Sequence, residues 1–120
     1  MTSESYETLY WGTFEDCLNK YKSLAHRVET IARRVAEDPL SSQSHLLGYK
    51  RGIELRGKRS RHFANRFCII YMVCNECIQK AFKERGFNNC YFCTNEPLKR
   101  VIFLGFGLHD DVYSQHWGIP

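Results

Sequence analysis

Residues 57–77, GKRSRHFANRFCIIYMVCNEC, decide the fold of this chain because three kinds of sequence follow one another there. A cluster of Arg and Lys residues runs into an apolar stretch, which ends in a Cys-x-x-Cys pair. The apolar stretch from Phe67 to Val73 is rich in β-branched and aromatic residues, and this composition predicts a β-strand. Val101 to Leu108 predicts a second strand. In the sequence, the cysteine pairs therefore stand between two predicted strands.

The cysteines have the spacing of a metal site. Cys74 and Cys77 are followed, after 12 intervening residues, by Cys90 and Cys93. Structural zinc takes four ligands in a tetrahedron, and each Cys-x-x-Cys turn can present two sulfurs to one ion. The residues between the pairs have room for a two-turn helix, Ile78 to Arg85. The pattern predicts one structural Zn²⁺ ion bound by all four thiolates, with reduced core cysteines or a redox dithiol as the alternatives.

Basic side chains are dense just before the first strand. Six Lys or Arg residues stand between Lys50 and Arg61, against the single acid Glu54. Phosphate backbones bind such charge by counterion release, and interleaved aromatic rings can stack on unpaired bases. The pattern predicts a surface for double- or single-stranded RNA, made by Lys50, Arg51, Arg56, Lys58, Arg59, Arg61 and Arg66. A solvated basic face is the alternative, and a short nuclear-import pattern is formed by Lys58, Arg59, Ser60 and Arg61.

A long amphipathic helix is predicted between Gly12 and Pro39, with Thr13 as its N-cap. About 24 residues would span roughly 36 Å. Apolar residues recur there with alternating spacings of three and four, as at the a and d positions of heptads. The pattern predicts a homo-oligomer formed through Tyr21, Leu24, Val28, Ile31 and Val35. In the alternative, the helix covers the core of its own domain.

The composition fits one folded domain. A chain of 120 residues with 43% hydrophobic and 25% charged residues is typical of globular proteins. The patterns predict an α+β fold in three regions: an N-terminal helical region (1–40), a basic segment (41–66), and a four-cysteine zinc-finger module with short strands, a short helix and a C-terminal tail (67–120). No run of 18 apolar residues and no signal-peptide pattern occurs, so neither membrane insertion nor secretion is expected.

Residues 50–105 resemble the small cysteine-rich proteins of plant RNA viruses. In the carlavirus-type nucleic-acid-binding proteins a basic motif precedes Cys-x2-Cys, 12 residues and a second cysteine pair, and the benyvirus silencing suppressors are similar. The matching residues here are Gly57, Lys58, Arg59, Ser60, Arg61, Cys74, Cys77 and Cys90. The resemblance implies a viral accessory protein that binds RNA, enters the host nucleus or nucleolus, and blocks RNA silencing.

Two functions remain as hypotheses. The first is a zinc-stabilised RNA-binding suppressor of host RNA silencing, located in the host cytoplasm and nucleus. The alternative is a nuclear zinc-finger adaptor or transcription regulator that binds protein or DNA. No enzymatic activity and no small-molecule substrate are expected: the H-x-E and P-C-x-x-C signatures of zinc deaminases are absent. The sequence His109-Asp110-Asp111 is interpreted as a loop.

Overall fold

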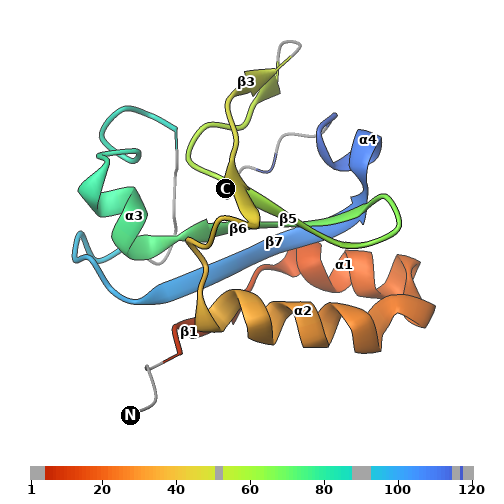
Figure 1. Cartoon of the computed structure of the whole chain (residues 1–120). Coiled ribbons are helices and arrows are strands. Elements are labelled where there is room, and N and C mark those ends of the chain that lie inside the picture. The colour runs from red at the N-terminus through yellow and green to blue at the C-terminus, as the bar shows by residue number, and fades with distance from the viewer. Residues whose placement is uncertain (1–4, 51–52, 88–92, 115–116, 118–120) are drawn as a thin grey trace.

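A five-stranded sheet forms the centre of the protein, as the computed structural model in Figure 1 shows. The structure describes residues 5–50, 53–87, 93–114 and 117. The strand order is β1–β7–β6–β5–β2, in which β1 is parallel to β7 and the other neighbours are antiparallel. The strands are β1 (Glu7–Tyr10), β2 (Ser44–Leu46), β5 (Arg59–Ala64), β6 (Phe67–Val73) and β7 (Arg100–Leu108). A separate two-stranded hairpin consists of β3 (Tyr49–Lys50) and β4 (Ile53–Glu54).

The central strand β6 is buried on both faces of the sheet, which explains its continuous apolar sequence. Ile69 and Tyr71 pack in the cluster that faces the helices, together with Val28 of the N-terminal half. Cys68 and Ile70 pack on the opposite face, in a cluster that also contains Leu55, Val112 and Trp117. Both strand predictions are confirmed: β6 has the predicted bounds and β7 begins one residue earlier.

Two antiparallel helices cover one face of the sheet, where the sequence predicted a single long helix. They are α1 (Gly12–Lys20) and α2 (Ala25–Glu37), joined through a short 3-10 turn (Lys22–Leu24). Tyr21 leaves the helical conformation, with φ −120° and ψ 58°. A straight helix of about 36 Å would exceed the nine-residue strand β7, which spans roughly 30 Å. The prediction of one long helix is therefore wrong, because folding back keeps both halves on the sheet.

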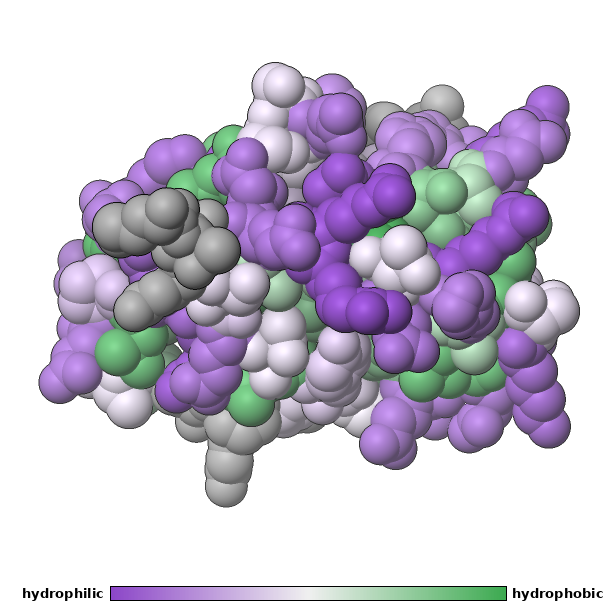
Figure 2. Space-filling view, turned by 60° about the horizontal axis from the view of Figure 1, so that its bottom comes forward, coloured by the Kyte–Doolittle hydropathy of each residue, from purple (hydrophilic) through white to green (hydrophobic). Residues whose placement is uncertain are grey.

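The side chains predicted to mediate self-association lie within the core of the chain. Val28, Ile31 and Val35 are buried, and Tyr21 and Leu24 pack partly buried against the same cluster. This arrangement corresponds to the alternative in which the helix covers its own domain. On the face that α1 and α2 form, mainly hydrophilic side chains are visible, with hydrophobic ones between them (Figure 2).

The cysteine-rich segment is part of the same domain, not a separate zinc finger. α3 (Cys74–Gln79) continues directly from β6, and α4 (His109–Val112) continues directly from β7. The helix predicted over Ile78–Arg85 is wrong, since α3 ends at Gln79. Although α+β describes the protein, the predicted combination of a long helix and a zinc-finger module is wrong. None of the helices in the described part of the chain has the length and apolar character needed to cross a bilayer.

Candidate functional site

Two histidines are stacked at one end of the sheet. His62 belongs to β5, and His109 is the first residue of α4. The strands β5 and β7 flank β6, and the N–H of His109 donates to the carbonyl of Arg66 at 2.6 Å. The ring centroids of the two histidines are 5.5 Å apart, with an interplanar angle of 22°. Residues that are distant in the sequence therefore form one imidazole pair.

Two further rings extend this pair. The centroid of His45, in β2, lies 6.5 Å from that of His62, and the ring of Tyr113 meets His109 edge-on at 4.5 Å. The hydroxyls of Tyr113 and Ser60 share a hydrogen bond of 2.7 Å, and Ser60 is fully buried. This bond attaches the Tyr113 ring to the sheet and so limits its movement beside His109.

A cavity of ≈ 550 Å³ opens beside the histidine pair. We call it the histidine pocket, and its lining residues are His62, Arg66, Leu108, His109, Asp110 and Asp111. Arg66 occupies the tight turn between β5 and β6, with φ 65° in the left-handed region. An oxygen of Asp110 lies 3.3 Å from Nδ1 of His109. The pocket thus combines two imidazoles, one guanidinium and two carboxylates.

The surroundings of His62 favour its neutral form. Burial lowers the pKa of His62, and positive charge on His109 and His45 lowers it further. Burial raises the pKa of the Tyr113 hydroxyl, although its hydrogen bond with Ser60 acts in the opposite direction. At neutral pH, His62 is therefore available to accept a proton, and Tyr113 keeps its own.

Such a set of groups can perform general acid–base catalysis. A neutral imidazole accepts a proton and a protonated one donates it, while a guanidinium stabilises negative charge on a phosphoryl group. Within the described ranges, no three His, Cys, Asp or Glu side chains form a group that could hold a metal ion. The pair His62 and His109 was missed by the sequence analysis. The only signal was the His-Asp-Asp sequence directly after a predicted strand.

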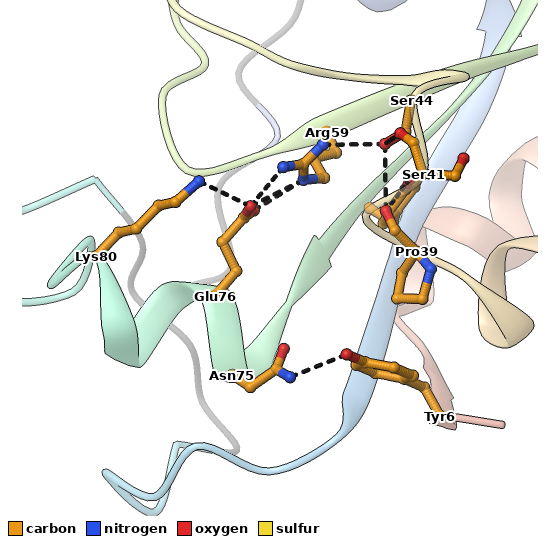
Figure 3. Close-up of polar contacts among 9 residues, drawn as sticks. Tyr6, Pro39, Ser41, Ser44, Arg59, Asn75, Glu76 and Lys80 are labelled. Atoms are coloured by element: carbon orange, nitrogen blue, oxygen red, sulfur yellow. Dashed lines mark hydrogen bonds and ion pairs between the residues drawn. The ribbon is translucent and has the colours of Figure 1, made fainter. Parts of the chain in front are cut away.

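Two of the predicted RNA-binding residues are instead part of the folded core. Lys58 is 4% exposed, and its Nζ donates to the carbonyl of Phe87 at 3.0 Å. Nε of Arg59 donates to both carboxylate oxygens of Glu76, at 2.9 and 3.0 Å. Figure 3 shows that Arg59 lies between Glu76 and Ser44 and that Lys80 approaches Glu76 from the other side.

The carboxylate at the centre of this network is 2% exposed. Burial alone would raise the pKa of Glu76, but hydrogen bonds from Arg59 and Lys80 outweigh it and lower the pKa. The stretch predicted as an import signal is not an exposed peptide, because Lys58 and Ser60 are buried and the residues from Arg59 onward belong to β5.

The other described residues of the predicted RNA-binding surface lie in different surroundings. Arg66 lines the histidine pocket, Arg61 donates to the side-chain oxygen of Gln43 at 2.7 Å, and Arg56 stacks on Phe87. Arg51 and the side chain of Lys50 lie outside the described residues. The predicted patch is thus divided among separate environments.

Three of the four predicted zinc ligands are described, and Cys90 lies outside the described residues. The thiol of Cys74 donates to the carbonyl of Glu96 at 3.4 Å, and Cys77 is buried. Burial raises the pKa of Cys74, with smaller contributions from the neighbouring thiols of Cys77 and Cys93. These thiols do not form a metal-ligating group in the described part of the protein. Zinc binding through all four cysteines stays a prediction, which metal analysis of the purified protein would test.

Comparison with known proteins gives a likeness of fold. No family model and no curated protein matches the chain. Among solved structures, it is similar to a chain of the RelBE2 toxin–antitoxin complex from Mycobacterium tuberculosis. The two chains share 19% sequence identity with a TM-score of 0.56, over 88% of this chain and 99% of the other.

This likeness overturns the resemblance to viral proteins. The similar fold spans nearly the whole chain and comes from a bacterial complex, so the plant-virus family assignment is wrong. The two predicted functions, the suppressor of RNA silencing and the nuclear zinc-finger adaptor, are wrong as well, because the similar fold belongs to neither class. The chain thus has the fold of a component of a bacterial toxin–antitoxin complex.

Proposed function

We propose that this chain is the RNA-cleaving member of a toxin–antitoxin pair. The observation that carries the proposal is the stacked pair of His62 and His109, which lines a pocket together with Arg66. The net charge of +4 supports a polyanionic substrate. The likeness to a chain of a toxin–antitoxin complex supports the biological setting. The sequence alone predicted no enzymatic activity, and the histidine pair is the reason for proposing one.

The proposed reaction is a transfer of the RNA phosphate to the neighbouring 2′-hydroxyl. His62 takes the proton of that hydroxyl while O2′ attacks phosphorus. The bond between phosphorus and O5′ breaks, and protonated His109 gives its proton to O5′. Asp110 orients His109 through Nδ1, and Arg66 stabilises the added charge on the phosphoryl oxygens. The products are a 2′,3′-cyclic phosphate and a 5′-hydroxyl, and no further reactant is consumed.

A groove between β1, α1 and α2 is the surface on which we place the protein partner. It has a volume of ≈ 390 Å³ and is lined by Tyr10, Phe14, Glu15, Leu18, Ala25, Val28, Glu29 and Ala32. Tyr10 is 50% exposed. The two carboxylates favour a partner helix with an apolar face flanked by Lys or Arg. A second copy of this chain is the competing occupant, and a concentration-dependent dimer mass in sedimentation would identify it.

Cleavage of a labelled single-stranded RNA tests the proposed activity. His62→Asn and His109→Asn should each lower kcat by about 10²–10⁴-fold, the usual contribution of general acid–base catalysis. KM should change little, because Arg66 remains in place. A matched control is His26→Asn, which removes an exposed imidazole from α2 on the opposite face of the sheet.

DNA of the same sequence should resist cleavage, since it lacks the 2′-hydroxyl that attacks phosphorus. Analysis of the product ends should find a 2′,3′-cyclic phosphate. The proposal fails if the unmutated protein does not cleave RNA, or if both histidine variants keep the full rate.

A further inference from the structure

The helix α4 carries His109, yet it is a single turn of four residues. A helix this short is not stable by itself, so its position depends on contacts with the rest of the protein. At its start, the backbone N–H of His109 donates to the carbonyl of Arg66 in the turn before β6. The contacts at its other end, together with this bond, determine where the ring of His109 lies relative to His62.

Each carbonyl group of α4 accepts a hydrogen bond from a residue that follows the helix. The backbone N–H of Tyr113 and the N–H and hydroxyl of Ser114 donate to the first three carbonyls. The last carbonyl, of Val112, accepts from Nε1–H of Trp117 at 2.6 Å, and both residues are buried. The final carbonyls of a helix lack partners within it, and a buried one needs a donor. Trp117 thus supplies this donor from outside the helix.

The sheet holds the indole of Trp117 in a defined place. The ring is 5% exposed and packs with Val112 in the apolar cluster on the face opposite α1 and α2. A Cβ atom at Gly105, in β7, would lie 2.5 Å from Cζ3 and 2.7 Å from Cη2 of the indole, closer than real Cβ atoms approach other atoms. Glycine at this position therefore leaves the space that the ring occupies.

We propose that Trp117 is a positioning residue for His109. The bond from its indole keeps α4 against the sheet, and α4 keeps the ring of His109 stacked on His62, with 5.5 Å between the centroids. Without the indole N–H, the buried carbonyl of Val112 would lose this donor, and a shift of α4 toward water would satisfy it. Such a shift separates the two imidazoles, while Arg66, which lies outside α4, remains in place.

Trp117→Phe tests the hydrogen bond, because phenylalanine keeps an apolar ring but has no N–H. In RNA cleavage, where the inference rests on the proposed function, kcat should fall by about 10–10²-fold, as expected when a reacting group is displaced by about 1 Å. KM should change little, because Arg66 lies outside α4. Urea denaturation gives the unfolded fraction of the variant, so that lost stability is not taken for lost positioning.

The position of His109 is also measured without RNA, by NMR. The nuclear Overhauser effect between the ring protons of His62 and His109 reports their stacking. It should be present in the unmutated protein and weakened or absent in Trp117→Phe. Gly105→Ala should act in the same way from the other side, because its methyl group displaces the indole. If folded Trp117→Phe keeps this effect at full intensity, the inference is wrong.

The two measurements separate this inference from the proposed function. If the unmutated protein does not cleave RNA, the proposed function fails, and the effect between the rings still tests Trp117. If Trp117→Phe loses that effect but keeps its kcat, Trp117 positions His109, and His109 is not the acid of the reaction.

Trp11→Phe is the matched control. Trp11 packs partly buried against the same apolar cluster, but it precedes α1 and is distant from α4 in the sequence. The control should leave kcat and the effect between the rings unchanged. Equal losses in Trp11→Phe and Trp117→Phe would mean that the whole cluster is loosened, and the inference would fail.

Should neither Trp117→Phe nor Gly105→Ala fold, hydrogen exchange in the unmutated protein decides. The indole N–H of Trp117 and the backbone N–H of His109 should show the same free energy of opening, since both bonds break when α4 leaves the sheet. An indole N–H that exchanges as fast as an exposed one would show that Trp117 does not hold α4.

Discussion

The two ends of β5 use basic side chains in opposite ways. At its start, Arg59 and the preceding residue Lys58 are drawn inward, where they bind the carboxylate of Glu76 and the carbonyl of Phe87. At the other end, His62 and Arg66 line an open cavity. The same stretch of basic sequence therefore supplies internal support at one end and reactive groups at the other. Burial, not charge density along the sequence, separates the two roles.

The largest expected effect comes from breaking the supporting end. Glu76→Ala should lower the free energy of unfolding by about 3–5 kcal/mol, because it leaves the buried guanidinium of Arg59 without its partner. Urea denaturation measures this loss. Glu29→Ala is the matched control: its exposed ion pair with Arg33 should contribute less than about 0.5 kcal/mol. Equal losses in the two variants would mean that the network around Glu76 is not structural.

Replacing both Arg59 and Glu76 tests whether this end of β5 serves only the stability of the fold. Arg59→Met/Glu76→Leu should be neutral or stabilising by about 1–4 kcal/mol, since it removes two buried charges together. RNA cleavage should persist, because neither Arg59 nor Glu76 lines the histidine pocket. Strongly weakened RNA binding in a stable double variant would instead return Arg59 to the RNA-binding surface that the sequence predicted.

The sequence predicted those strands whose character is visible in their own consecutive residues. The apolar runs of β6 and β7 were recognised because both strands are buried on two faces. The strand β5 lies in the basic segment, where Gly48, Gly52 and Gly57 predict a loop or short hairpin rather than a long helix. What makes it a strand is its antiparallel pairing with β6, the next strand in the chain, together with the neutralisation of Arg59 by Glu76, which lies beyond β6 in the sequence.

Long-range contacts also explain why the candidate site was missed. His62 and His109 meet only because β5 and β7 flank the same strand, and no local pattern records this. The three-and-four spacing of apolar residues between Gly12 and Pro39 correctly predicted an apolar helix face. It did not predict that the helix is interrupted at Tyr21, because this interruption depends on the size of the sheet that the helices cover. The Cys-x-x-Cys spacing is typical of a zinc finger and therefore predicted a separate module. In the structure, the first cysteine pair directly continues the buried strand β6 and belongs to the same domain.

The pH dependence of cleavage tests the reactive end. If His62 is the base, kcat/KM should fall by about tenfold for each unit below the pKa of His62 in the free protein, since only the neutral ring accepts a proton. Burial and the neighbouring histidines lower the pKa of His62, so the fall should begin below the ordinary value of about 6.5. Rates measured between pH 4.5 and 8 would show this limb. If the rate already falls between pH 8 and pH 7 as the pH is lowered, the base is another group.

The smallest expected effect is the contribution of the His62 ring to the free energy of unfolding at different pH values. In the folded protein the pKa of His62 lies below its ordinary value, because burial and the other histidines disfavour the charged ring. In the unfolded chain it returns to about 6.5. Between these two values the unfolded chain binds more protons, so the contribution of His62 to stability is fully present above about pH 6.5 and is lost as the pH falls.

The difference in unfolding free energy between the unmutated protein and His62→Asn should therefore decrease from pH 7 to pH 5. Because His62 is exposed at the edge of the pocket, solvent keeps the effect well below that of Glu76→Ala. A difference that grows on acidification would mean that His62 is charged in the folded protein, and the ring could then act as an acid but not as the base.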